Sequence, residues 1–510
     1  MDIGALFIEG LGLVLQPETL LYLIFGIVMG IIGGALPGFS SSNTIAIMLP
    51  MMLVVPTHAA LVFCTGVYCG CMYGDSIPAI LFSVPGTPGA GATALDGHPL
   101  SQQGKADIAF GLSAGSSLLG GIIAAVCAIF LTPIMSSYAL KFGPAELFLL
   151  TMVSIVIVST ISGNTAQEKR RGIVAGLFGF LFATISACPA YGMPRMTFGF
   201  LELYDEIPLV SVMIGMFAIP TILQLAFKDR IIEADASELK NIGKFSGQWI
   251  GLKEAFKRPV NIIRSTLIGF LVGAAPGTGS SVATYVSYGQ AKMWSKDPDS
   301  FGKGSYDGIT ASEAANNAVC AGALIPTLTL GIPGSGATAM MLVVFIIQGI
   351  VPGPNLMRDH ALPCYTILAS TLVAPLFTVP FSLLFNRFSA KLTALRSSYL
   401  VPILLVLCLL GTYAVRLYIF DIYMTLFFGL LALLMRKYRY PVIPFILGII
   451  LGPIAEHNLF RTSRLASGGN LSIFFSTTGI VLIVILIALI FFGFIWPMFK
   501  KNPKNMEFSS

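Results

Sequence analysis

The sequence interrupts a long apolar run at residues 34–42, which read Gly34-Ala35-Leu36-Pro37-Gly38-Phe39-Ser40-Ser41-Ser42. Proline removes a backbone donor and glycine permits a positive φ, so we expect a helix to break at this point. Backbone groups freed by a break cannot be satisfied by lipid and must face protein, water or a ligand. The stretch therefore predicts a broken helix within an all-α polytopic membrane protein.

Composition favours the same class. Of 510 residues, 55% are hydrophobic and only 11% are charged, whereas soluble proteins carry about a quarter charged residues. Apolar runs long enough to cross roughly 30 Å of hydrocarbon recur from Leu20 to Pro497. The net charge of +6 comes from Lys and Arg clusters between these runs, which is the positive-inside pattern and not a nucleic-acid-binding patch.

The break belongs to an internal duplication. Three motifs recur in the same order at offsets of 239, 245 and 233 residues: Pro37-Gly38 with Pro276-Gly277, Pro88-Gly89 with Pro333-Gly334, and Pro208 with Pro441. Chance explains any one match in a chain with 53 Gly and 30 Pro, but hardly all three. We expect a first half over residues 19–227 and a second half over residues 261–456.

The remaining segments flank these halves. Residues 1–18 are predicted to form an outer N-terminal segment, and residues 228–260 a polar cytoplasmic linker. Residues 457–510 are predicted to hold an outer loop, one extra transmembrane helix without a counterpart, and a cytoplasmic tail. If the basic clusters are all cytoplasmic, the N-terminus lies outside and equivalent loops of the two halves lie on opposite faces. The halves are then inverted repeats, which are characteristic of secondary transporters.

The breaks predict an anion site made without cations. A half-helix that starts after a break presents unpaired amides and a positive dipole end, to which hydroxyl groups add donors. The alternative is that the small residues only let helices pack closely. The predicted substrate-binding residues are Pro37, Gly38, Ser40, Ser41, Ser42, Asn43, Thr87, Gly89, Pro276, Gly277, Thr278, Ser280, Ser281, Pro333, Gly334, Ser335 and Gly336.

Two acidic residues, Asp75 and Glu313, occur in apolar surroundings at nearly equal distances from the first motif of their own half. A carboxylate within a membrane is costly unless it is paired, hydrated or bound to a cation. We therefore take both as candidates for Na⁺ or proton coupling, against an alternative in which they cap helices near an interface. Further candidate oxygen ligands for the coupling ion are Thr93, Asn316, Asn317 and Thr338. We predict no transition-metal site and no other cofactor.

Enzyme motifs are weak. Residues 111–115 fit the G-x-S-x-G nucleophile pattern around Ser113, but small residues are abundant in this chain. The sequence contains no HExxH motif and no P-loop, so the energy for transport must come from an ion gradient or a partner. An intramembrane serine hydrolase remains an alternative, as does a passive organic-anion channel.

At these motifs the chain resembles the large membrane subunit of the tripartite tricarboxylate transporters, the TctA-like family. The resemblance runs from about residue 18 to residue 475 and rests on these stretches: 34–38, 85–89, 94–97, 273–277, 313–317, and 325–326 through 331–338. The family often has a small residue where this chain has Asp75, so the resemblance assigns no role to that carboxylate.

The resemblance implies secondary active uptake of a di- or tricarboxylate, such as a citrate-like anion, across the bacterial inner membrane, with Na⁺ as the common coupling ion. It also implies two partners, a small four-helix membrane subunit (TctB-like) and a periplasmic solute-binding protein (TctC-like). An elevator-like movement of paired re-entrant hairpins is expected by analogy. The C-terminus is expected in the cytoplasm.

Overall fold

The Pro-Gly pairs coincide with helix ends in the computed structural model, which describes residues 3–161, 165–188, 192–204, 206–227, 245–393, 397–466 and 474–491. Helix α2 (Pro17–Ala35) ends just before Pro37-Gly38, and α3 (Ser41–Met52) begins just after it. Likewise, α13 (Pro259–Ala274) ends before Pro276-Gly277, and α14 (Gly279–Met293) follows. Gly38 and Gly277 have φ values of 81° and 75°. Residues other than glycine rarely adopt such φ values, so glycine allows the chain to turn at both places.

The second pair of motifs also separates helices. In the first half, α4 (Thr57–Gly74) and α5 (Ser76–Phe82) precede the turn, and a short 3₁₀ segment, η1 (Pro88–Ala90), leads into α6 (Gly91–Leu100). In the second half, α15 (Tyr306–Leu330) precedes the turn and α16 (Gly336–Ile347) follows it. Gly331 ends α15 in the left-handed conformation that commonly terminates helices.

Seven helical segments in the described part of the chain are long and apolar enough to cross a membrane. They are Pro17–Ala35, Thr57–Phe82, Pro88–Ala139, Leu209–Ala226, Ala361–Phe388, Ile419–Lys437 and Val442–Leu465. The chain is thus mostly helical with several candidate spans, as a multi-pass membrane protein requires.

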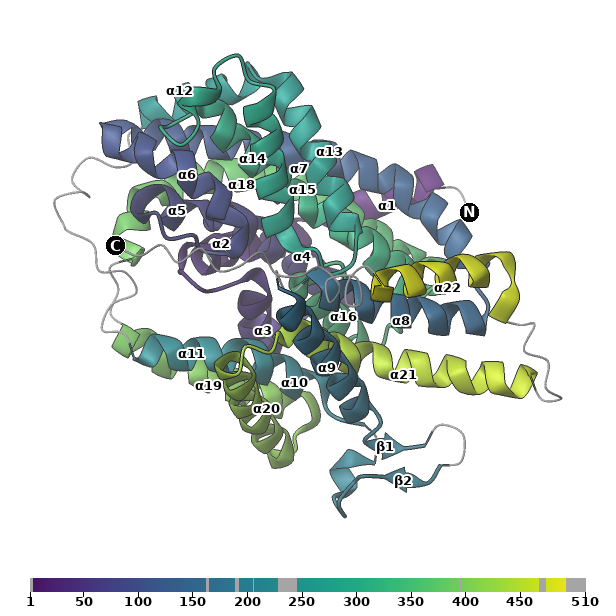
Figure 1. The fold of residues 1–510 in the computed structure, drawn as a ribbon. Helices are drawn as coiled ribbons and strands as arrows, with labels where there is room; N and C mark the ends of the chain where they lie inside the picture. Colours follow the sequence, from purple (N-terminus) through teal and green to yellow (C-terminus); the bar gives the residue numbers. More distant parts are fainter. Residues whose placement is uncertain are drawn as a thin grey trace, which may run out of the picture. The chain divides into compact units, whose positions relative to one another are not determined.

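The chain forms two compact units, and unit 1 comprises Met1–Lys141 and Pro208–Leu433. Helices α2 and α4 pack against each other extensively. Glycines repeat every four residues on both helices, at 26, 30 and 34 and at 66, 70 and 74, and allow the two backbones to approach closely. Helices α13, α14 and α15 lie together (Figure 1). Its other elements are α1 (Ile3–Val14), η2 (Ser101–Lys105), α7 (Ala106–Ala139), α10 (Leu209–Met213), η4 (Ile214–Ala218), α11 (Ile219–Ala226), α12 (Phe245–Phe256), η5 (Pro298–Ser300), α17 (Leu356–Asp359), α18 (Ala361–Thr393), α19 (Ser397–Arg416) and most of α20 (Ile419–Lys437).

Unit 2 comprises Phe142–Ile207 and Leu434–Ser510. Helix α21 (Val442–Leu465) packs on α8 (Pro144–Ile161) and α9 (Ala166–Ala183), and α22 (Thr477–Ile490) packs on α8. The short strands β1 (Ser186–Ala187) and β2 (Pro194–Arg195) form an antiparallel hairpin, followed by η3 (Leu201–Leu203). Two hydrogen bonds of 2.5 and 3.0 Å join Arg195 to Glu456 on α21 and hold the hairpin in place.

Some predicted segments extend beyond the described residues. Within the predicted linker, residues 228–244 lie outside the described part, and α12 occupies residues 245–256. The predicted extra C-terminal helix corresponds to α22 as far as Ile490, whereas the tail beyond residue 491 is outside the described part.

Candidate functional site

The four helix breaks meet in one place within unit 1. The Gly38 amide donates to the Gly86 carbonyl at 3.1 Å, which joins the two breaks of the first half. The Gly277 amide donates to the Gly334 carbonyl at 3.0 Å, which joins the two breaks of the second half. Each of these two bonds lies within one half of the chain.

Two close approaches connect the halves. A Cβ atom added to Gly336 would collide with the Ser42 hydroxyl, so the start of α16 touches the start of α3. A Cβ atom added to Gly89 would collide with the Ser280 hydroxyl, so η1 touches the start of α14. With the two backbone bonds, these contacts close a ring of four breaks, which we call the break ring. The sequence predicted the breaks, and the structure brings all four together.

Hydroxyl side chains cap two of the helices that begin at the break ring, α3 and α16. The Ser40 hydroxyl accepts a hydrogen bond from the backbone amide of Asn43 at 3.3 Å at the start of α3. Ser335 and Thr338 cap the start of α16 reciprocally, with the Ser335 amide 2.9 Å from Thr338 Oγ1. The hydroxyls of Tyr68 and Ser335 lie 3.0 Å apart. Each helix start still has first-turn amides without an intrahelical acceptor, which are suited to an anion.

The other predicted substrate-binding residues have individual positions around the ring. The side-chain amide of Asn43 donates to Thr221 Oγ1 at 3.0 Å. The Thr278 hydroxyl donates to the Ala275 carbonyl at 3.0 Å at the end of α13. Thr87 accepts from the Gly89 amide at 3.2 Å. Ser41 is buried at the start of α3, Ser281 is half-buried on α14, and Pro37, Pro276 and Pro333 occupy the turns themselves.

The carboxylate of Asp75 is fully buried at the junction of α4 and α5. It accepts from the Thr87 hydroxyl, which attaches it directly to the break ring. It also accepts from Asn316 Nδ2, at 3.2 Å to Oδ1 and 3.3 Å to Oδ2. Asn316 donates as well to the Met72 carbonyl at 2.9 Å. Asp75 from the first half is thus bound to Asn316 from the second.

Asn316 Oδ1 is a buried oxygen that has no hydrogen-bond partner in the described part of the chain. It lies beside Gly89, because a Cβ atom there would come 2.5 Å from it and would also meet the Ser280 hydroxyl. An unsatisfied buried oxygen in a native protein calls for an explanation, such as a bound ion or water. The carboxylate of Asp75, the hydroxyls of Thr87 and Ser280 and this amide oxygen form an oxygen-rich set of the kind that suits Na⁺.

Glu313 forms a second buried carboxylate site on α15. Its Oε1 accepts from Thr93 Oγ1 at 2.5 Å, and its Oε2 accepts from Ser113 at 2.8 Å and Ser117 at 3.3 Å. Asn317 Nδ2 donates to Ser117 at 2.7 Å. Ser113 therefore serves as a hydrogen-bond donor to a carboxylate.

The two carboxylates lack basic partners among the described residues. In the part of the chain that the structure describes, no Lys or Arg forms an ion pair with Asp75 or Glu313. Two uncompensated buried charges would be costly, and a proton or a small cation is the usual compensation. A cavity of about 10 Å³, close to the size of one water molecule, lies next to this network and includes Ser117 and Asn317 in its lining.

Sequence reasoning overlooked several polar partners in this region. Ser312 lies 2.8 Å from Thr93, Ser76 lies 2.9 Å from Ser113, and Ser117 binds Glu313. The spacing of Ser113 and Ser117 offered a signal, because residues four apart share one helix face. No sequence signal pointed to Tyr68, which reaches Ser335 from a helix of the other half.

Similarity to known proteins indicates the family of the chain. The tripartite tricarboxylate transporter TctA family profile matches residues 20–447. An uncharacterised 52.8 kDa protein from the TAR-I ttuC′ 3′ region of Agrobacterium vitis is 30% identical over 475 residues, which cover 93% of this chain and 92% of that protein. An uncharacterised protein from the TAR-II ttuC′ 3′ region of the same organism is 32% identical over 228 residues, 44% of this chain and 94% of that protein. No solved structure matches the chain significantly. The match over most of the chain shows that it belongs to the tripartite tricarboxylate transporter TctA family.

Proposed function

We propose that this chain is the large subunit of a secondary transporter that takes up a di- or tricarboxylate across the bacterial inner membrane, coupled to Na⁺. The observation that carries the proposal is the junction of Asp75 and Asn316 at the break ring. Among the described residues, the carboxylate of Asp75 has no ion-pair partner and the amide oxygen of Asn316 has no hydrogen-bond partner, and both lie next to helix starts suited to an anion. One region thus has the groups for both a cation and an organic anion.

The anion and the cation use different groups. The carboxylate substrate binds at the starts of α3 and α16, where first-turn amides and the hydroxyls of Ser41, Ser42 and Ser335 act as donors. Na⁺ binds to oxygens of Asp75, Thr87, Ser280 and Asn316. Because the two ions attract one another over a short distance in a poorly hydrated site, each increases the affinity for the other.

The duplicated motifs support an alternating-access mechanism. Each half contributes two helix breaks to the break ring, one at its first motif and one at its second. Inverted repeats of secondary transporters contribute broken helices to a shared site in the same way. We propose that the halves are inverted repeats, with the N-terminus outside and the C-terminus cytoplasmic, and that one part of the protein carries the site across the membrane in an elevator-like movement. A small TctB-like membrane subunit and a periplasmic TctC-like binding protein complete the transporter.

Reconstitution tests the proposal. Proteoliposomes that contain this chain and its small subunit, supplied with the binding protein, are assayed with radiolabelled succinate, malate, tartrate and citrate. We expect at least one substrate to accumulate above its external concentration when an inward Na⁺ gradient is imposed. Movement only down the substrate gradient would instead indicate a passive channel. Accumulation driven only by a proton gradient would assign the coupling to H⁺, and accumulation driven only by ATP would refute an ion-coupled mechanism.

A further inference from the structure

A surface cavity of about 500 Å³ lies in unit 1, away from the break ring, where the start of α13, the end of α14 and the start of α15 meet. Its charged lining residues are Arg258, Arg264, Lys296, Asp297 and Asp307. The cavity plays no part in the transport site described above.

Two of its basic residues are available to a ligand. Arg258 is already bound to Asp307 at 3.1 Å and to Glu254 at 2.9 Å. Hydrogen bonds from Lys257 and Arg258 lower the pKa of Glu254, so this carboxylate stays ionised and holds Arg258. Arg264 and Lys296 form no ion pair within the described residues, and the remaining acid of the lining is the single residue Asp297.

Aromatic residues give the cavity the composition of a membrane interface. The Arg264 guanidinium lies 4.5 Å from the centre of the Trp294 ring, and Trp294 is 64% exposed. Trp residues combined with Arg and Lys concentrate at the level of lipid headgroups. Trp249, on α12, is also exposed, so at least two of the three tryptophans in the chain have exposed side chains.

An apolar stripe runs along α13 from the cavity. Val260, Ile263, Leu267 and Leu271 are between 43% and 66% exposed. Val260, Leu267 and Leu271 are four, three and seven residues from Arg264 and therefore share its helix face, whereas Ile263 lies at the edge of that face, three and four residues from Val260 and Leu267. The stripe has the length and character to contact an acyl chain, and Arg264 lies near its end at the cavity.

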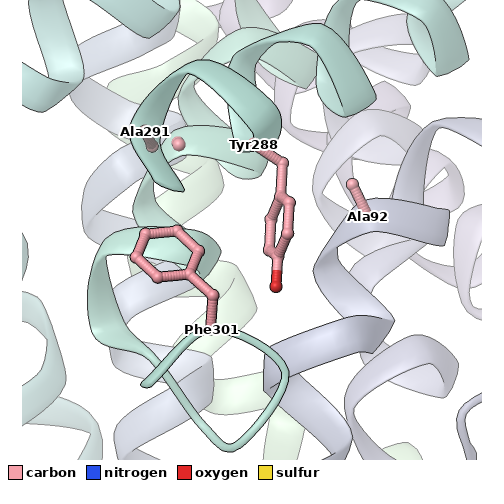
Figure 2. Packing of buried hydrophobic residues seen from close by; sticks show 5 residues of the cluster. Ala92, Tyr288, Ala291 and Phe301 are labelled. Atoms are coloured by element: carbon pink, nitrogen blue, oxygen red, sulfur yellow. The ribbon is translucent and has the colours of Figure 1, made fainter. Parts of the chain in front are cut away.

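The inner wall of the cavity is firmly packed. Figure 2 shows Tyr288 of α14 between Phe301 and Ala92, with Ala291 one turn further along the helix. The Tyr288 and Phe301 rings meet edge to face, with their centres 5.4 Å apart. Ala291 belongs both to this cluster and to the cavity lining, so the wall beside Arg264 and Lys296 is part of a buried core.

We propose that this cavity binds the headgroup of an anionic phospholipid. The phosphate lies between Arg264 and Lys296, and one acyl chain follows the α13 stripe from Val260 to Leu271. Arg264 and Lys296 have no ion-pair partner among the described residues, and they lie beside an exposed tryptophan and an apolar helix face. This combination favours a lipid, because a soluble anion would contact the two cations alone. The site would fix this end of α13 and α14 at the membrane surface.

Fluorescence quenching tests the site in the reconstituted full chain. Replacing Trp249 and Trp496 with Phe leaves Trp294 as the sole tryptophan. Brominated phosphatidylglycerol or brominated phosphatidylcholine is then titrated into phosphatidylcholine vesicles. We expect phosphatidylglycerol to quench Trp294 at a concentration lower by about ten-fold, since each nearby basic residue favours an anionic lipid. Equal quenching of Trp294 by both lipids in this single-tryptophan protein would overturn the proposal.

Paired charge variants locate the preference. Arg264→Gln with Lys296→Gln should abolish the difference between the lipids, whereas Lys253→Gln with Lys292→Gln removes the same charge outside the cavity lining and should preserve it. A preference that survives the first pair would refute the assignment to this cavity. A preference that inorganic phosphate removes at constant ionic strength would show a site for free phosphate and would likewise overturn the lipid assignment.

Discussion

Asn316 donates from its side-chain amide to both carboxylate oxygens of Asp75, at 3.2 and 3.3 Å, and links two residues that are 241 positions apart in the chain. The amide oxygen of the same Asn316 has no hydrogen-bond partner in the described part of the protein. One side chain thus orients the carboxylate and also presents a second oxygen beside it. This pairing is the basis of the proposed Na⁺ site.

Replacing Asn316 with Ala should weaken Na⁺ coupling. The variant loses the unpartnered oxygen and the donor that orients Asp75, and loss of such a ligand or of its support typically costs ten-fold or more in ion affinity. We expect the Na⁺ concentration for half-maximal uptake to rise by roughly ten-fold. Asn458→Ala is the control, because Asn458 is buried in unit 2 and its side-chain amide donates to the Ile454 carbonyl of its own helix. The same Na⁺ dependence in both variants would exclude Asn316 from the site.

The Glu313 network should contribute to stability. Ser113→Ala removes a 2.8 Å hydrogen bond to a buried carboxylate, which costs about 1.5–3 kcal/mol. The neighbouring Ser116→Ala is a matched control, because the Ser116 hydroxyl is buried without a partner in the described structure. We expect a lower thermal midpoint for Ser113→Ala only. In a double-mutant cycle with Glu313→Gln, additive effects would show that the two residues do not interact.

The same variant distinguishes a transporter from a hydrolase. Ser113 acts here as a hydrogen-bond donor, so Ser113→Ala should retain measurable uptake at temperatures well below its thermal midpoint. A hydrolytic activity that the unmodified protein shows and that Ser113→Ala abolishes with an unchanged fold would instead be the behaviour of a catalytic nucleophile.

Gly89 should tolerate no side chain. A Cβ atom there would collide with the Ser280 hydroxyl and Asn316 Oδ1, so Gly89→Ala pushes apart the two halves of the break ring. We expect uptake to fall at least ten-fold, because small displacements of groups that bind a substrate often cause losses of this size. Gly289→Ala is the control, because its added Cβ would meet no atom of another described segment within 4 Å and a helical alanine is favourable. Normal uptake by both variants would mean that the close contact at Gly89 is not needed for transport.

Asp96 should hold the loop before α15. Its Oδ1 accepts from the backbone amides of Gly302, Gly304 and Ser305 at 2.7, 2.9 and 2.8 Å. Asp96→Ala leaves these three amides without their acceptor, so we expect much faster hydrogen exchange at residues 302–305 and a lower thermal midpoint. Asp299→Ala, in an exposed part of the same loop, should change neither. Unchanged exchange in Asp96→Ala would show that other contacts hold the loop.

The breaks were predictable because their cause is local. Proline followed by glycine at 37–38 and 276–277 favours a helix break through the local backbone, and the copied motifs revealed the matching positions. Asp75 and Glu313 were also predictable as candidates, since carboxylates in apolar segments are rare. Partners such as Ser42 with Gly336 were not predictable, because they depend on how distant helices pack and leave no mark in either local sequence.

Direct Na⁺ binding tests the central claim, that Asp75 forms part of a cation site coupled to the carboxylate site. The purified large subunit is incubated with ²²Na⁺, with and without saturating substrate, in its original form and as Asp75→Asn. We predict saturable binding that the carboxylate strengthens, as reciprocal linkage requires, and loss of that binding in Asp75→Asn. Na⁺ binding that is absent from the original protein, or that persists unchanged in Asp75→Asn, would contradict the account.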